Sequence, residues 1–281
     1  MSGIIGIAST GNALHSVLQG LQQLAQTGHH HCGLVVHGRQ GHTPSPPRLH
    51  RHRRAQGAAA WLQQLRESHL AQPFKESPLN ADSPQRLNGL NGLNGLNGLN
   101  GLNGLNGLHG CVALGHTGPS GGTGPQALQQ ALPQLSHGPK AHLNSPTRVA
   151  VVLHGTLQAS PALREALIER DYHFKSNCDA ELLAHLIDVS CQSDPVQALH
   201  RALGLVQGQV CVGVLFHDHP ERVFAVRREV DLHAAASPGL LAWSSHPAAL
   251  PAGLQALPAW PDGQVLEVHA HPHGVTHQLH S

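Results

Sequence analysis

The chain begins with a residue that could act as a nucleophile, Ser2. It follows Met1 and precedes the apolar run GIIGI, and a side chain as small as that of serine allows the initiator methionine to be removed. A terminal serine then carries a hydroxyl and its own α-amine, which are a nucleophile and a base on one residue. A hydroxyl ionises far less readily than a thiol, whose usual pKa is about 8.5. The sequence therefore predicts a weak terminal nucleophile.

Histidine is abundant, with 26 residues, and two clusters have spacings that could bind a metal ion. The first is His29-His30-His31-Cys32, and the second is His269, His271 and His273. Alternation along a strand would put the second set on one face, and imidazole suits zinc, copper or nickel. Histidine is however spread along the whole chain, and Pro272 interrupts the second set. We favour a general enrichment in histidine, predict no metal site, and keep a histidine-rich metal-binding protein as an alternative.

Short segments in order along the chain carry further candidate positions. They are 1–7 (MSGIIGI), 27–34 (TGHHHCGL), 113–122 (ALGHTGPSGG) and 171–186 (DYHFKSNCDAELLAHL). Taken together they resemble the glutaminase domain of class II glutamine amidotransferases, and most closely that of glutamine:fructose-6-phosphate aminotransferase. The last segment is the closest match, whereas the second keeps only two glycines and a leucine.

The resemblance implies a role for five positions. Ser2 stands where the family has its nucleophilic cysteine, Gly118 where it has the arginine that holds the glutamine α-carboxylate, and His154 where it has an asparagine of the oxyanion hole. Gly155 matches the glycine beside that asparagine. Asp179 matches the aspartate that receives the glutamine α-amine, although an aspartate there could equally cap a helix.

Three of these positions lack the group that the chemistry needs, so we expect a degenerate glutaminase with little or no glutamine hydrolysis. A slow Ser2-dependent amidohydrolase that supplies ammonia to a partner synthase is one alternative, and a non-catalytic scaffold is another. The resemblance implies glutamine as the ligand and no cofactor. Because the chain ends at Ser281, we expect any ammonia acceptor, such as a sugar-phosphate or synthase subunit, to be a separate chain.

Composition excludes other classes of function. A formal charge of +1 offers no field for a polyanion, and we interpret the cluster of Arg48, Arg51, Arg53 and Arg54 as a solvated loop rather than a nucleic-acid surface. Five scattered cysteines suit a reducing compartment. The apolar N-terminal run is too short for a signal peptide or a membrane span. The sequence therefore predicts a cytoplasmic protein that binds neither nucleic acid nor membrane.

One low-complexity segment interrupts the chain. The triplet Leu-Asn-Gly repeats seven times over residues 87–107. A period of three matches neither a strand nor an α-helix, and a glycine at every third place is costly to order. We therefore predict a flexible loop inserted into a single glutaminase-like domain that spans residues 1–281.

The remaining pattern predicts an α+β protein, and the resemblance implies a four-layer α-β-β-α sandwich of the N-terminal-nucleophile type. Strands occur in runs between pairs of helices rather than in strict alternation, which disfavours a doubly wound sheet. The expected helices are 12–26, one that begins at Ser160-Pro161 and ends near 170, 179–189, and one that begins at Asp194-Pro195; the expected strands are 34–36, 148–153, 210–216, 223–226 and 264–268.

Overall fold

The computed structural model describes residues 2–26, 31–40, 46–54, 58–70, 108–119, 125–142 and 145–281. The Leu-Asn-Gly repeat at 87–107 lies outside these residues, as do His29 and His30. The flexible loop and the single domain boundary therefore stay predictions.

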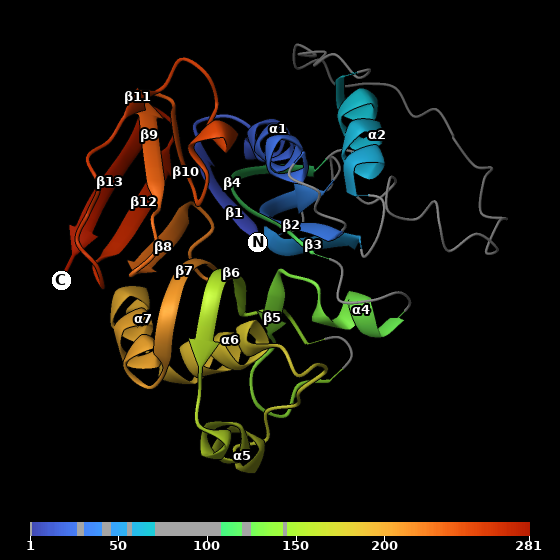
Figure 1. Cartoon of the computed structure of the whole chain (residues 1–281), viewed down its shortest axis with the longest axis vertical. Coiled ribbons are helices and arrows are strands. Elements are labelled where there is room, and N and C mark those ends of the chain that lie inside the picture. The colour runs from blue at the N-terminus through green and yellow to red at the C-terminus, as the bar shows by residue number, and fades with distance from the viewer. Residues whose placement is uncertain are drawn as a thin grey trace, which may run out of the picture.

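Two antiparallel sheets form the centre of the molecule (Figure 1). The seven-stranded sheet has the order β11-β9-β10-β1-β4-β2-β3, and the six-stranded sheet has the order β13-β12-β8-β7-β6-β5. The first sheet contains β1 (Gly3–Ser9), β2 (His31–Gln40), β3 (Arg48–Arg54), β4 (Leu108–Gly118), β9 (His233–Ser237), β10 (Leu240–Ser244) and β11 (Gln255–Ala256). The second contains β5 (Gln134–Ser136), β6 (Val149–Gln158), β7 (Gln207–Phe216), β8 (Arg222–Arg228), β12 (Val265–His271) and β13 (Gly274–His280).

Helices cover the outer faces of both sheets. Figure 1 shows α1 (Ala13–Ala25) and α2 (Ala58–Leu70) beside the first sheet, and α6 (Asp179–Ser190) and α7 (Pro195–Gly204) beside the second. The shorter α4 (Pro125–Gln130) and α5 (Pro161–Glu169) and the 3-10 helix Pro247–Ala249 complete the described helices. The predicted four-layer α-β-β-α sandwich is therefore confirmed.

Alternation along the central strands builds three hydrophobic layers. Along β1, Ile5 and Ile7 pack under α1, whereas Ile4 and Ala8 face the second sheet. Along β6, residues 149 and 151 face α6 while residues 150 and 152 face the first sheet. Side chains on successive strand residues point to opposite faces, so a strand covered on both sides must be apolar at nearly every position.

The space between the sheets is filled by Trp243 of β10, which is fully buried. A Cβ added at Gly6 of β1 would lie 2.1 Å from the indole, and one added at Gly213 of β7 would lie 2.3 Å from it. Both glycines thus leave the room that the ring occupies. The sheets pack at this distance only because the two positions facing the indole have no side chain.

The helix starts agree with the sequence in three cases and differ in one. Asn12, Ser160 and Asp194 are N-caps whose side chains accept backbone hydrogen bonds from the first turn, and they begin α1, α5 and α7. The prediction that Asp179 caps α6 is wrong, because Cys178 is the N-cap and makes no side-chain cap bond. Asp179 is the first helical residue, where its charge still favours the positive end of the helix dipole.

The arginine cluster was also wrongly predicted as a solvated loop. Residues 48–54 form β3, an edge strand paired with β2. Arg51 and Arg53 are only partly exposed, and they lie on the same face of the strand because they are two residues apart. Charged side chains are usual on an edge strand, so composition alone gave the wrong structure.

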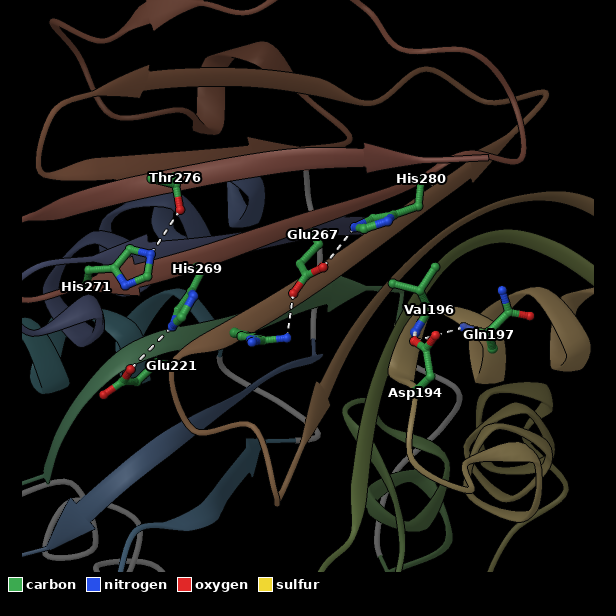
Figure 2. Close-up of polar contacts among 10 residues, drawn as sticks. Asp194, Val196, Gln197, Glu221, Glu267, His269, His271, Thr276 and His280 are labelled. Carbon is green, nitrogen blue, oxygen red and sulfur yellow. Dashed lines mark hydrogen bonds and ion pairs between the residues drawn. The ribbon is translucent and has the colours of Figure 1, made fainter.

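Replacing Asp194 tests whether its carboxylate fixes the start of α7. Its Oδ1 accepts hydrogen bonds from the backbone N–H of Val196 at 2.9 Å and of Gln197 at 3.3 Å (Figure 2). We expect Asp194→Ala to lower the free energy of unfolding by about 1 kcal/mol in urea titrations, whereas Asp194→Asn keeps the cap and should lose far less. Equal losses in the two variants would contradict a capping role.

From the burial of two histidines we predict that the fold loses stability in mild acid. Burial lowers the pKa of His37 to about 4 and the pKa of His185 to about 4, while an unfolded histidine keeps a pKa near 6.5. Between these values the unfolded chain binds more protons, so stability is complete above pH 6.5 and falls as the pH falls towards 4.

Urea titrations between pH 7.5 and 4.5 measure this effect. The free energy of unfolding should fall by up to about 1.4 kcal/mol per pH unit for each additional proton bound by the unfolded chain. His185→Gln should flatten the profile, and His277→Gln, which changes an exposed histidine, should leave it unchanged. A stability that stays constant from pH 7 to pH 5 would rule this account out.

Candidate functional site

Ser2 lies at the start of β1, the fourth of seven strands in the first sheet. Its side chain reaches the second sheet, where its Oγ lies 2.9 Å from Nδ1 of His154 in β6. The two residues are far apart in sequence and come from facing sheets. The structure therefore brings together the predicted nucleophile position and the predicted oxyanion position.

Gly155 follows His154 in β6, and its backbone conformation and close neighbours leave no room for a side chain. Its φ is +107°, and an added Cβ would lie 2.1 Å from the carbonyl oxygen of Gln209 in the neighbouring β7. A positive φ is strained for any residue with a Cβ. The conformation of Gly155 is thus fixed by pairing within the second sheet, and it leaves the backbone beside Ser2 exposed.

The contact between Ser2 and His154 has a definite chemical meaning. Unprotonated Nδ1 of His154 accepts a hydrogen bond from the Ser2 hydroxyl and can take its proton, as a general base does. A nitrogen that accepts from Ser2 is not at the same time a donor to an oxyanion. In the tautomer whose Nδ1 carries no hydrogen, His154 offers Ser2 a base and does not supply an amide N–H, which is the group that the resemblance assigns to this position.

Gly118 ends β4 and lies beside Ser2, because Gly3 pairs with Thr117 in the antiparallel register of β1 and β4. On its other side Gly118 pairs with His31 of β2. A Cβ at Gly118 would lie 2.7 Å from Cε1 of His31 and 3.0 Å from Cε1 of His116. The room for a side chain at this position is therefore occupied by two imidazole rings.

These two rings form a stacked pair, with centroids 5.1 Å apart and planes inclined by 21°. Nδ1 of His31 lies 2.6 Å from the carbonyl oxygen of Pro119, so this nitrogen carries the hydrogen and donates. Burial lowers the pKa of His31 below its usual value, which leaves the ring neutral at pH 7. A neutral ring of this tautomer presents an acceptor lone pair at Nε2 and gives no positive charge for a carboxylate.

Asp179 is exposed at the start of α6. Partial burial raises the pKa of its carboxyl, and the nearby Arg164 guanidinium lowers it to a smaller extent. The structure thus joins Ser2, His154, Gly155 and Gly118 in one place, and Asp179 lies at the start of α6.

The histidines near the C-terminus do not form the set that alternation predicted. His269 and His271 share a face of β12, with ring centroids 3.7 Å apart, but β12 ends at His271 and His273 lies in the following turn. Figure 2 shows that His269 points to Glu221 and His271 to Thr276. Within the described ranges no three His, Cys, Asp or Glu side chains are grouped so that they could hold a metal ion.

Sequence reasoning missed the part that His31 and His116 play. His31 was grouped with a candidate metal cluster, whereas it fills the space over Gly118. One feature of the sequence could have indicated this arrangement. The resembled family has a small serine at position 31 and a large arginine at position 118, whereas this chain has a large histidine at position 31 and a glycine at position 118. The exchange has meaning only once β2 and β4 are known to pair in this register.

Comparison with known proteins identifies relatives over part of the chain. Three curated relatives are glutamine–fructose-6-phosphate aminotransferases (isomerizing). The enzyme from Clostridium perfringens is 35% identical over 91 residues, which are 32% of this chain and 15% of the relative. That from Zymomonas mobilis is 35% identical over 89 residues, 31% and 15% of the two chains, and that from Thermus thermophilus is 37% identical over 84 residues, 30% and 14%. The chain thus matches about 15% of the length of these relatives.

Solved structures match over nearly the whole chain. The glutamine phosphoribosylpyrophosphate amidotransferase of B. subtilis, in complex with ADP and GMP, is 18% identical and has a TM-score of 0.66 over 99% of this chain and 49% of its own. A structure of the allosteric regulatory enzyme of purine biosynthesis has a TM-score of 0.64 at 18% identity, again over 99% and 49%. At this identity the likeness shows the fold alone.

No family model matches the chain. The sequence relationship is limited to about a third of the chain, and the structural likeness covers nearly all of it and concerns the fold. The chain is a distant homologue of the N-terminal region of glutamine–fructose-6-phosphate aminotransferases and has the N-terminal-nucleophile fold of class II glutamine amidotransferases.

Proposed function

We propose that this protein is a degenerate homologue of the glutaminase domain, with little or no hydrolysis of glutamine. One observation carries the proposal: the stacked rings of His31 and His116 occupy the space over Gly118. The resemblance assigns to this position the arginine that holds the α-carboxylate of glutamine. A glycine under two imidazole rings leaves that carboxylate without a bidentate partner.

The contacts of Ser2 and His154 support the same conclusion. The resemblance assigns a cysteine to position 2, and the hydroxyl of serine ionises far less readily than a thiol does. The loss of one oxyanion donor alone typically lowers the rate by about two to three orders of magnitude, and His154 directs its Nδ1 to Ser2 instead. Each change weakens a different requirement: the nucleophile, the oxyanion site and the binding of substrate.

The Ser2–His154 contact also favours a second candidate, a slow Ser2-dependent amidohydrolase. In this reaction His154 takes the hydroxyl proton while Ser2 Oγ attacks the amide carbon, and His154 then returns the proton to the leaving nitrogen, which departs as ammonia. Water attacks the resulting ester and regenerates Ser2. The base is His154, so this mechanism does not depend on a free α-amine. Any acceptor of the ammonia would be a separate synthase.

We also propose that the protein is located in a reducing compartment such as the cytosol. All five cysteines lie in the described part of the chain, and each is a free thiol. No helix among the described residues is long and apolar enough to cross a membrane. The free thiols support this location because disulfides are rare where glutathione keeps cysteine reduced.

Ammonia release from glutamine tests the proposal directly. We expect the purified protein to release no more ammonia than Ser2→Ala, and we expect a glutamine-analogue electrophile to leave Ser2 unlabelled in peptide mass spectrometry. Release that is lost in both Ser2→Ala and His154→Ala would instead establish the amidohydrolase. Release that survives Ser2→Ala would point to a contaminating enzyme.

Restoring the family residues tests which neighbour blocks the site. The combination of Ser2→Cys, Gly118→Arg and His154→Asn should stay inactive, because the Cβ of an arginine at 118 would lie 2.7 Å from His31. Adding His31→Ser removes the ring and should give measurable ammonia release. Mass spectrometry would verify that Met1 has been removed from both proteins.

The matched control for this series carries the same changes with Ser2→Ala in place of Ser2→Cys, and it should be inactive. If the three-residue combination is as active as the four-residue one, His31 does not occlude the position, and the observation that carries the proposal loses its meaning.

A further inference from the structure

A basic cavity is lined by none of Ser2, His154 and Gly118. Its volume is about 390 Å³, and among its lining residues are Arg51, Arg53, His137, Lys175, Glu181 and His185. In Figure 1, β5 lies between β3, which carries the arginines, and α6. Cavities of roughly 300–1,000 Å³ are the usual size for small-molecule sites.

The elements around the cavity turn cationic side chains towards one place. Arg51 and Arg53 are two residues apart on β3 and thus share a face. Glu181 and His185 are four residues apart on α6 and share a face of that helix. Lys175 lies in the turn that precedes α6 and completes the lining. One side comes from a strand of the first sheet and the other from helix α6 and the segment before it, so the cavity is a product of the fold.

The three cations of the basic cavity are not neutralised. Arg51 donates to the carbonyl oxygen of Pro133, and Arg53 donates to the carbonyl oxygens of Gln129 and Ala131. Within the described ranges neither arginine, nor Lys175, has an ion-pair partner within 4.0 Å. Backbone carbonyls satisfy donors but carry no net charge.

The one carboxylate in the cavity is already engaged. Oε1 of Glu181 accepts from the backbone N–H of Lys175 at 2.8 Å, and Oε2 accepts from the backbone N–H and the hydroxyl of Ser176 at 2.7 and 2.6 Å. Its charge acts on both arginines from a distance. Against three cations, one carboxylate leaves two positive charges uncompensated.

Burial disfavours the positive charge of Arg51. Burial lowers the pKa of Arg51 to about 9, with the charge of Arg53 as the next cause. At pH 7 the guanidinium is still protonated, so a positive charge is held in a place that disfavours it. An anion that enters the cavity relieves this cost and makes charge-assisted hydrogen bonds, which are the stronger kind.

We propose that the basic cavity binds a small dianion of the phosphate-monoester class. Two uncompensated charges match a dianion, and two guanidinium groups with an ammonium group suit its several oxygens. This inference goes beyond the proposed function, because it assigns a ligand to a site that contains none of Ser2, His154, Gly155, Gly118 or Asp179. It holds whether or not glutamine is hydrolysed.

Thermal unfolding with inorganic phosphate and with glycerol 3-phosphate tests the proposal, with chloride and acetate at equal ionic strength as references. A ligand that binds the folded state raises the melting temperature in a saturable way. We expect both phosphate probes to do so and both references to have no saturable effect. Titration calorimetry would give the dissociation constants.

Variants separate the cavity from general charge. Arg53→Gln and Lys175→Gln should each weaken phosphate binding at least about tenfold, because each removes a charge-assisted bond. Lys175 is exposed, so its variant keeps the fold even if Arg53→Gln does not. Arg48→Gln is the matched control, since Arg48 lies on the same strand, is exposed and does not line the cavity.

Three results would overturn the proposal. The first is no saturable shift with either phosphate probe. The second is a shift that Lys175→Gln and Arg53→Gln leave unchanged, or that Arg48→Gln reduces equally. The third is an equal saturable shift with acetate, which would show that the cavity does not select a dianion. Glutamine hydrolysis is not a readout here, so failure of the proposed function leaves this test intact.

Discussion

The fold depends on the packing of two sheets around the indole of Trp243. Gly6 of β1 and Gly213 of β7 leave room for that ring, and the strands on either side are buried on both faces. Because β1 is held in the middle of this packing, the residue before it, Ser2, is carried to the second sheet and meets His154. The contact is therefore a consequence of how closely the sheets approach, and a larger side chain at either glycine would separate Ser2 from His154.

The site itself shows how one fold can exchange its chemistry through neighbouring strands. Loss of the side chain at Gly118 opens a space, and the large ring of His31 on the paired strand fills it. The resemblance assigns an arginine to position 118, and in this chain the ring of His31 lies over a glycine there. His154 makes the opposite exchange, since it adds a base next to a weaker nucleophile. Under the proposed function, close packing persists where the groups that bind glutamine are lost.

Local signals in the sequence predicted what local physics determines. Ser160 is recognisable as a cap, and Asp194 as the start of a helix, because these signals depend on the first turn alone. The four-layer fold came from the resemblance and from strands grouped between helices. The predictions that were wrong concern features that depend on tertiary structure. The four arginines lie on β3, which is an edge strand beside a cavity. His273 lies outside β12 because the chain turns at Pro272. The stacking of His31 on His116 was invisible because it depends on register between strands.

The distribution of positive charge is the final constraint on what this protein can bind. Its formal charge is only +1, so no long-range field attracts an anion, and recognition must come from cations held at one place. Around Gly118 the described neighbours are the imidazole rings of His31 and His116 and a backbone carbonyl. In the basic cavity two guanidinium groups and an ammonium group face one engaged carboxylate. The position to which the resemblance assigns the carboxylate-binding arginine is a glycine here, whereas the cations of the basic cavity have no ion-pair partner among the described residues. The proposed selection of an anionic ligand therefore depends on β3, the strand whose arginines composition alone would place in a solvated loop.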